Sequence, residues 1–286
     1  MLTMALSPRL NMNQEQRSSG IQLSAQEFQW IIKFLYEKTG ISLSDGKQAM
    51  VMGRLEKRLR ARELKSYSDY FSLLGKVGNE AETTVAIDLL TTNETYFFRE
   101  PKHFDFLRSV VFPLFAKQRK IRIWSAASSS GEEAYTLAMN LAEYYPSDQW
   151  EVIGTDISTQ VLEKARRGLY PLSGVDKIPR NLLQKYCLKG KDEFEDFFLI
   201  DSKLRNKVQF KHANLIEKLP EIGLFEVIFL RNVMIYFDMP TKQNLIARII
   251  EKLQPNGYLI ISHSETLNGL TSSLTLVGPS IYQKRE

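Results

Sequence analysis

The sequence contains a single cysteine, Cys187, and no apolar run long enough to cross a bilayer. One cysteine cannot form an internal disulfide, which fits a reducing compartment such as the cytoplasm. Apolar stretches such as 225–230 and 258–261 fall far short of the roughly 20 residues of a membrane helix, so we expect buried strands there. The composition therefore indicates a soluble globular protein without direct membrane insertion.

A secretory signal is also missing, because residues 1–19 have neither a basic lead nor an apolar run of the required length. We expect residues 1–20 to form a flexible arm. No internal repeat or low-complexity tract follows. The formal net charge is +5, a mild excess that indicates an anionic partner only if the cations cluster.

Residues 21–90 have the pattern of an all-α domain. Apolar residues recur at the helical spacing i, i+3, i+4 and i+7 in Phe28, Ile31, Ile32 and Leu35, and no strand-like alternation interrupts the segment. This spacing predicts a helical N-terminal domain over 21–90.

One helix of this domain combines an apolar stripe with a neighbouring basic face. Few acids lie within one helical turn of these cations, so their mutual repulsion is not offset locally. Such a face is either a solvated surface or a docking surface for an anionic partner. Its cations are Arg54, Lys57, Arg58, Arg62 and Lys65.

From residue 121 the pattern changes to short apolar runs that alternate with helical segments, which is typical of a doubly wound α/β domain. We expect this domain to cover residues 91–286. Strands are predicted over 121–124, 151–155, 208–210, 225–230 and 258–262, helices over 131–145, 160–166 and 241–253, and a closing hairpin over 274–284. Residues 168–207 are too long for a simple connection and predict a small inserted β subdomain, with a helical run at 181–188 and a strand at 197–200.

Ligands of doubly wound folds lie beyond the carboxyl ends of the strands, so residues that follow each strand are candidates for a site. The first such loop, 125–133, lacks the pattern G-x-G-x-x-G and carries Glu132 and Glu133, which would repel a phosphate. Two acids suit a ligand with a cationic head, such as the amino group of a methionine moiety. Alternatively, Ser130 and Glu133 form a capping box.

Polar residues also follow the later strands, and two of these positions can be interpreted in two ways. Asp156 is placed to accept hydrogen bonds from ribose hydroxyls, or to begin the next helix. Asn214 and Leu215 suit an adenine edge and face, or a simple turn. Arg231 and Asn232 follow a buried strand, where unpaired polar groups are costly.

Taken together, these segments resemble the CheR-type chemoreceptor glutamate O-methyltransferases. The resemblance covers nearly all of the chain from about residue 22, and it lies in the strings TTNETYFFRE (91–100), WSAASSSGEEAY (124–135), IGTDIS (153–158), ANL (213–215) and FLRNVMIYFD (229–238). It implies a methyltransferase α/β domain with a small β subdomain, preceded by a helical domain. The usual glycine-rich first loop of methyltransferases is replaced by Ala and Ser, as is typical of this group.

The resemblance also implies a cofactor and site residues. Tyr236 would lie beside the transferred methyl group, and Arg99 and Tyr236 would orient the reactants. An ionised glutamate needs no general base. The residues that would line the S-adenosylmethionine site are Asn93, Thr95, Arg99, Glu133, Asp156, Asn214, Leu215, Arg231 and Asn232.

The partners implied are the cytoplasmic domains of methyl-accepting chemotaxis receptors, approached through Arg54, Lys57, Arg58 and Arg62. We expect a cytoplasmic monomer without a metal, recruited to receptor arrays. A receptor C-terminal peptide is a further candidate partner, although the acidic end of residues 189–196 departs from a glycine-rich tip. The rival functions are a nucleic-acid methyltransferase, which the lack of stacking aromatics disfavours, and a non-catalytic cofactor sensor.

Overall fold

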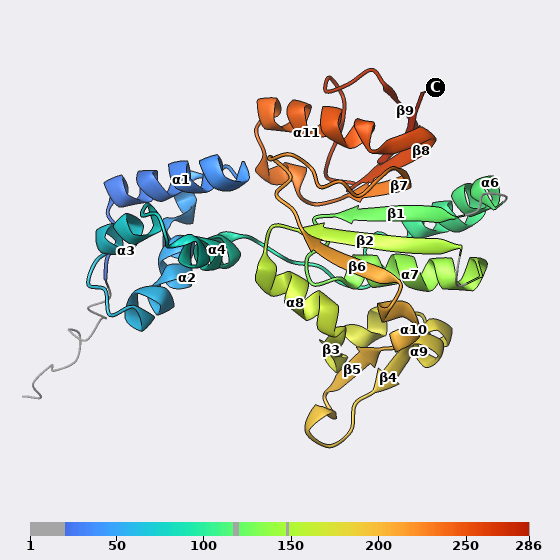
Figure 1. Cartoon of the computed structure of the whole chain (residues 1–286), viewed down its shortest axis with the longest axis horizontal. Helices are drawn as coiled ribbons and strands as arrows, with labels where there is room; N and C mark the ends of the chain where they lie inside the picture. The colour runs from blue at the N-terminus through green and yellow to red at the C-terminus, as the bar shows by residue number, and fades with distance from the viewer. Residues whose placement is uncertain (1–20, 117–119, 147–148, 286) are drawn as a thin grey trace, which may run out of the picture.

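The computed structural model describes residues 21–116, 120–146 and 149–285, and the expected arm at 1–20 lies outside them. A helical domain stands beside an α/β domain, against the carboxyl ends of the central strands (Figure 1). The helical domain consists of α1 (Ala25–Thr39), η1 (Asp45–Lys47), α2 (Gln48–Ala61), α3 (Tyr67–Leu74) and α4 (Glu80–Leu90).

The first helix illustrates why this segment is helical. Ser24 and Glu27 form a reciprocal capping box at its start, and Gly40 ends it in the left-handed conformation. Phe28, Ile31 and Leu35 are buried, as their spacing predicted. These side chains join residues of α2, α3 and α4 in one hydrophobic core.

A buried acid, Glu82 of α4, neutralises part of the basic face of α2. Its carboxylate lies 2.6 Å from Arg58 Nη2 and 2.5 Å from Arg62 Nη2, and it accepts a hydrogen bond from the Tyr70 hydroxyl. Glu82 is only 2% exposed. The charge repulsion expected along α2 is thus relieved by an acid 20 or more residues away, which helical spacing could not reveal.

The α/β domain is built on a seven-stranded sheet of order β6-β2-β1-β7-β8-β10-β9. The first five of these strands are parallel, and β9 and β10 form the predicted antiparallel hairpin. Their bounds are β1 (Ile121–Ala126), β2 (Trp150–Asp156), β6 (Val208–His212), β7 (Phe225–Leu230), β8 (Leu253–Ile261), β9 (Leu274–Gly278) and β10 (Ile281–Lys284).

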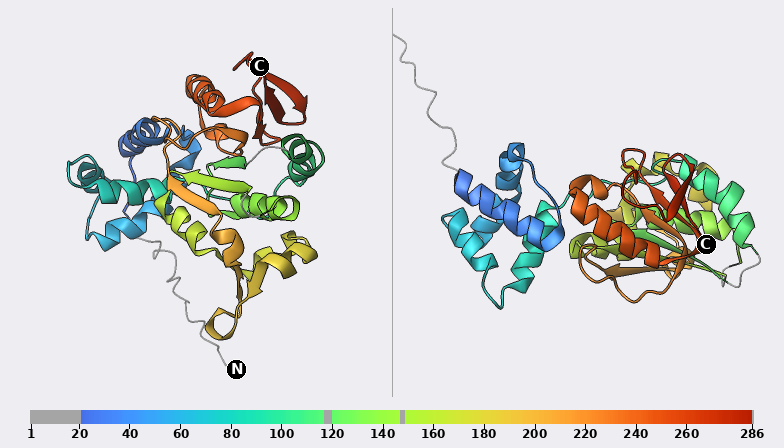
Figure 2. Two further views of the ribbon diagram at one scale, coloured as in Figure 1. Left: turned by 45° about the vertical axis from the view of Figure 1, so that its right-hand side comes forward. Right: turned by 90° about the horizontal axis from the view of Figure 1, so that it is seen from above.

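Helices cover both faces of this sheet (Figure 2). One face packs on α5 (Lys102–Phe106), η2 (Leu107–Val111), α6 (Phe112–Phe115), α7 (Glu132–Tyr144) and α8 (Thr159–Arg167). The other face packs on α11 (Met239–Glu251). The predicted helix at 241–253 begins earlier, because Asp238 caps it by accepting the Thr241 N–H.

Residues between α8 and β6 form a separate three-stranded antiparallel sheet of order β3-β5-β4. The predicted helical run at 181–188 ends at Tyr186, because Cys187 and Leu188 pair instead with Ile200 and Leu199. The subdomain contains β3 (Leu169–Pro171), η3 (Leu172–Lys177), α9 (Arg180–Tyr186), β4 (Cys187–Lys189), η4 (Asp192–Phe194), β5 (Phe197–Ile200) and α10 (Ser202–Arg205).

None of the helices in the described part of the chain combines the length and the apolar character that crossing a bilayer requires.

Glu82→Gln should destabilise the helical domain by about 3 kcal/mol, because it leaves two arginines without their buried counter-charge. Urea unfolding measures this loss. Hydrogen bonding from Arg58 lowers the pKa of Glu82 from 4.5 to about 2, so the stabilisation is present above pH 4.5 and is lost as the pH falls towards 2. Glu56→Gln, which removes an exposed pair with Arg60, is the matched control, and an equal effect of both variants would contradict the prediction.

Candidate functional site

A cavity of about 360 Å³ lies at the carboxyl ends of the central strands, between the two domains. Every residue predicted from the sequence for the cofactor or the reaction lines it. These residues come from the segment before α5, the start of α7, the last residue of β2 and the segments after β6 and β7, and they are Asn93, Thr95, Arg99, Glu133, Asp156, Asn214, Leu215, Arg231, Asn232 and Tyr236.

The helical domain supplies a wall of the same cavity, which our reading of the sequence missed. The Ser42 N–H donates to the Tyr236 carbonyl at 2.8 Å, and Gly40 packs so closely that a Cβ there would lie 2.6 Å from Ile216 Cγ2. Helical periodicity marks the buried face of a helix but says nothing of the loops between helices. The wall is made by Thr39, Ile41, Ser42, Leu43, Ser44, Lys47 and Met50.

The loop after β1 has a tightly constrained backbone. Ala127 and Ser129 have positive φ, and Gly131 has φ 95° where a Cβ would lie 2.8 Å from Ala165 Cβ. Glycine is therefore required at 131, although the rest of the usual glycine loop is absent. The alternative of a Ser130–Glu133 capping box is wrong, because Gly131 occupies the N-cap and the Ser130 hydroxyl donates to Glu132.

Asp156 joins this loop to the end of β2. Its carboxylate accepts the N–H groups of Ser129 and Ser158, both at 2.9 Å, and only 6% of the residue is exposed. Burial raises the pKa of Asp156, while these N–H bonds act in the opposite direction. The cap of α8 is Ser158, which accepts the Val161 N–H, so the carboxylate keeps lone pairs for a ligand in the cavity.

Arg231 is 5% exposed, and its positive charge is satisfied by two acids. Its guanidinium lies 2.8 Å from Glu133 Oε2 and 3.0 Å from Glu100 Oε2, and Nη2 also donates to the Arg99 carbonyl at 2.6 Å. Glu133 further accepts the Ser125 hydroxyl at 2.7 Å. A buried charge of this kind is tolerated only because it is fully paired.

Glu265 holds the turn that carries Asn232 and leads to Tyr236. Its carboxylate accepts the N–H groups of Asn232, Val233 and Met234 at 2.9–3.1 Å, and Asn232 adopts φ 56°. Burial raises the pKa of Glu265, against the effect of these N–H bonds. Sequence reasoning missed this residue, because it follows no strand directly and lies more than 30 positions from the turn.

The segment before α5 brings Arg99 into the cavity. Arg99 Nη1 donates to the Glu94 carbonyl at 3.0 Å, and its guanidinium lies 5.5 Å from the ring centre of Tyr96. Asn93 accepts the Ser129 hydroxyl on its backbone carbonyl, which ties this segment to the β1 loop. The Tyr236 side chain reaches the same cavity from the opposite loop.

Asn214 is used differently from what its position suggested. Its amide donates to the Lys38 carbonyl at 2.8 Å and to Glu217 at 3.0 Å, so both donor hydrogens are engaged within the chain. Leu215 is 7% exposed and presents an apolar surface to the cavity. In this arrangement Asn214 connects the two domains at the cavity wall.

The cations predicted to contact a receptor lie on α2, outside the cavity lining. Arg54 donates to the carbonyls of Leu90 and Thr91, and Arg58 and Arg62 bind Glu82. Lys57 is exposed to solvent. The structure therefore gives three of these side chains internal partners.

The chemistry of the cavity fits S-adenosylmethionine. The Ser128 hydroxyl is buried, lines the cavity and makes no hydrogen bond with any described residue, so it has capacity for a ligand. Glu133 suits an amino group, Asp156 suits hydroxyl donors, and Leu215 suits an apolar ring face.

Two family models match the chain. The model of the CheR methyltransferase SAM-binding domain matches residues 93–282, and that of the CheR methyltransferase all-alpha domain matches residues 26–91. The chain is 38% identical to a chemotaxis protein methyltransferase of Borreliella burgdorferi, with 96% of this chain and all of that protein covered. It is 39% and 38% identical to the chemotaxis protein methyltransferases of Salmonella typhimurium and Escherichia coli, with 93% of each chain covered.

The matches to both domain models, the order of the motif strings and the relatives aligned over nearly their full length all point to one family. The chain belongs to the CheR methyltransferase family.

Proposed function

We propose that this protein transfers a methyl group from S-adenosylmethionine to glutamate side chains of chemoreceptor cytoplasmic domains. The observation that carries the proposal is the cavity into which five separated motif segments bring Arg99, Glu133, Asp156, Leu215 and Tyr236. When bound, S-adenosylmethionine supplies an electrophilic methyl group and leaves as S-adenosylhomocysteine, while the glutamate becomes a methyl ester.

The residues of the cavity suit a carboxylate nucleophile, which needs no general base. None of the described lining residues is a histidine, and the acids Glu133 and Asp156 are held by Arg231 and by backbone N–H groups. A nucleic-acid base could stack on aromatic rings of the lining such as Tyr96 and Tyr236, but methylation of a base amino group would also require a residue that takes up a proton. The site therefore favours a carboxylate over a base as methyl acceptor.

Arg99 and Tyr236 are proposed to position the reactants. Among the described residues Arg99 donates one hydrogen bond, to the Glu94 carbonyl, so the other N–H groups of its fork are available for a carboxylate. The Tyr236 hydroxyl can donate one hydrogen bond. Alignment in a site that excludes water then supplies the main part of catalysis.

Receptor binding is proposed to use the exposed part of the α2 face. The side chain of Arg62 is 46% exposed and that of Arg58 is 27% exposed, and Lys57 is exposed beside them. Glu82 cancels one of these charges, so a net positive surface remains for an acidic receptor helix. Arg54 holds α2 to the end of α4.

Asp156→Ala should weaken binding of S-adenosylhomocysteine by about tenfold or more, because hydrogen bonds to a charged acceptor are lost. Isothermal titration calorimetry measures this. Asp88→Ala is the matched control: Asp88 also accepts N–H groups at the start of α8, from Thr159 and Gln160, but does not line the cavity. Equal losses in both variants would remove Asp156 from the cofactor site.

Arg99→Ala should lower kcat on a receptor cytoplasmic fragment by about tenfold or more, because the fork that positions a carboxylate is gone. Transfer of labelled methyl groups, with saturating cofactor, measures it. Arg99→Lys keeps the charge without the planar fork and should recover only part of the rate. Wild-type turnover of the alanine variant would exclude a positioning role for Arg99.

The same assay tests whether the enzyme needs a receptor C-terminal peptide, when receptor fragments with and without that peptide are compared.

Lys57→Glu combined with Lys65→Glu should raise KM for the receptor fragment and flatten its salt dependence, because screened attraction to an acidic helix is lost. Neither lysine has an internal ion pair among the described residues, so folding should be kept. The double change Lys33→Glu and Lys76→Glu, on other parts of the helical domain, is the control. An unchanged KM in the first variant would make this face a solvated surface.

A further inference from the structure

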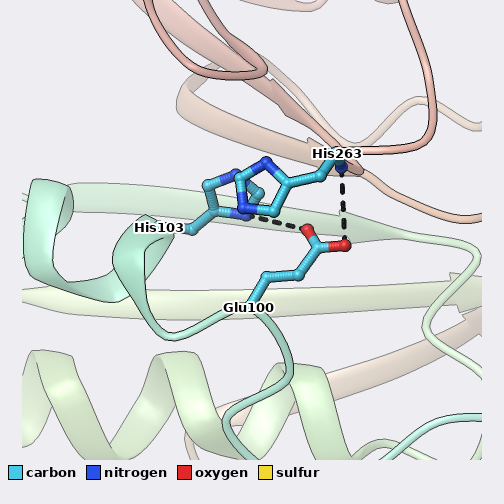
Figure 3. Close-up of side chains that lie close together, drawn as sticks. All are labelled: Glu100, His103 and His263. Carbon is cyan, nitrogen blue, oxygen red and sulfur yellow. Dashed lines mark hydrogen bonds and ion pairs between the residues drawn. The ribbon is translucent and has the colours of Figure 1, made fainter.

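Three side chains of metal-ligand type meet behind the cavity, from segments far apart in the sequence. Glu100 precedes α5, His103 lies on α5, and His263 follows β8, and their ligand atoms all lie within 4.8 Å of one another (Figure 3). His103 Nδ1 is 3.3 Å from Glu100 Oε2, and the rings of His103 and His263 are 4.7 Å apart. The cluster is therefore compact enough to demand a physical explanation.

The guanidinium of Arg231 already provides the positive charge that a metal ion would bring. It lies 3.0 Å from Glu100 Oε2, while Glu100 Oε1 accepts the Ser262 hydroxyl at 2.9 Å. Burial lowers the pKa of His103 to about 4, so this ring is neutral near pH 7. Burial would raise the pKa of Glu100, but Arg231 and Ser262 outweigh it and the pKa is lowered. The cluster is an ion-pair network centred on an ionised Glu100.

The network continues into the cavity through Arg231. Arg231 binds Glu100 on one side and Glu133 on the other. Glu133 lines the cavity, whereas Glu100 does not. Glu100 thus acts on Glu133 through the guanidinium, while its contact with Ser262 leads to Asn232, whose amide donates to the Ser262 hydroxyl.

The charges of Glu100, Arg231 and Glu133 together determine how strongly the cavity attracts a cation. Two carboxylates share one guanidinium, so the group carries a net negative charge in a place where solvent screens little. If Glu100 lost its charge, Arg231 would be shared no longer and would neutralise Glu133 alone. The carboxylate that faces the cavity would then attract a cationic ligand group less strongly.

We propose that Glu100 is a positioning residue for the amino-acid end of the cofactor: by holding Arg231 from behind, it leaves the Glu133 carboxylate charged and correctly placed for the ligand's amino group. This inference rests on the proposed function, since it takes Glu133 to bind that end of S-adenosylmethionine. The Ser262 hydroxyl and the His263 backbone N–H, which both donate to Glu100 Oε1, hold the Glu100 carboxylate in place.

The test compares two ligands that differ in the amino-acid part. S-adenosylhomocysteine carries it, and 5′-methylthioadenosine lacks it. Glu100→Gln should weaken binding of S-adenosylhomocysteine by up to about tenfold, because Arg231 would then neutralise Glu133 and weaken its charge-assisted hydrogen bond to the ligand's amino group, and should leave 5′-methylthioadenosine unchanged within about twofold. Calorimetry gives both dissociation constants, and in methylation assays KM for S-adenosylmethionine should rise while kcat is kept.

Glu226→Gln is the matched control. Glu226 is a buried acid on β7, the strand that leads to Arg231; it accepts the Arg122 N–H and does not line the cavity. Its variant should bind both ligands as the wild type does. Equal weakening of both ligands by Glu100→Gln would show a merely structural role and overturn the inference, as would no weakening of either. A wild type that binds both ligands equally would instead contradict the placement of Glu133 in the proposed function.

Discussion

The buried ion pair of Arg231 with Glu100 and Glu133 is the interaction on which the geometry of the site depends. It joins three parts of the chain, which are the end of β7, the segment before α5 and the first turn of α7. Packing alone would bring these parts near each other without fixing their contacts. Removing Arg231 would leave two carboxylates in the interior without their counter-charge, which is far more costly than the pair is worth. The arrangement therefore specifies one geometry.

The sheet makes this pairing necessary. Residues 225–230 are buried throughout, and all except Glu226 are apolar, so Arg231 follows directly on a largely apolar buried strand. The turn that follows cannot be satisfied by regular structure, and Glu265 accepts its N–H groups instead. Three carboxylates from elsewhere in the chain thus hold this loop: Glu100 and Glu133 pair with Arg231, and Glu265 accepts the N–H groups that follow it. The cavity lies between this loop and the helical domain.

Residues with local signals could be predicted from the sequence. The buried face of α1 follows from spacing, the parallel strands from their apolar runs, and the positions after the strands from the rule that strand ends carry ligands. The partners of those residues could not be predicted, because ion pairing leaves no periodic trace. Glu82, Glu100 and Glu265 each bind arginine or backbone N–H groups that lie 20 or more positions away in the sequence. Likewise, the α1–α2 loop reaches the cavity only because the domains dock.

The same reasoning explains why the basic helix is a less direct indicator of function than the cavity. A cation on a helix surface can serve a partner or the protein itself, and spacing does not distinguish the two. Arg54 and Arg58 are engaged inside the helical domain, which stabilises α2 against α4. Because α2 begins at the cavity wall and continues along the exposed face, a receptor helix bound to Lys57 and Arg62 would lie on the same element that closes the cofactor cavity. Docking and catalysis would then be connected through one rigid helix.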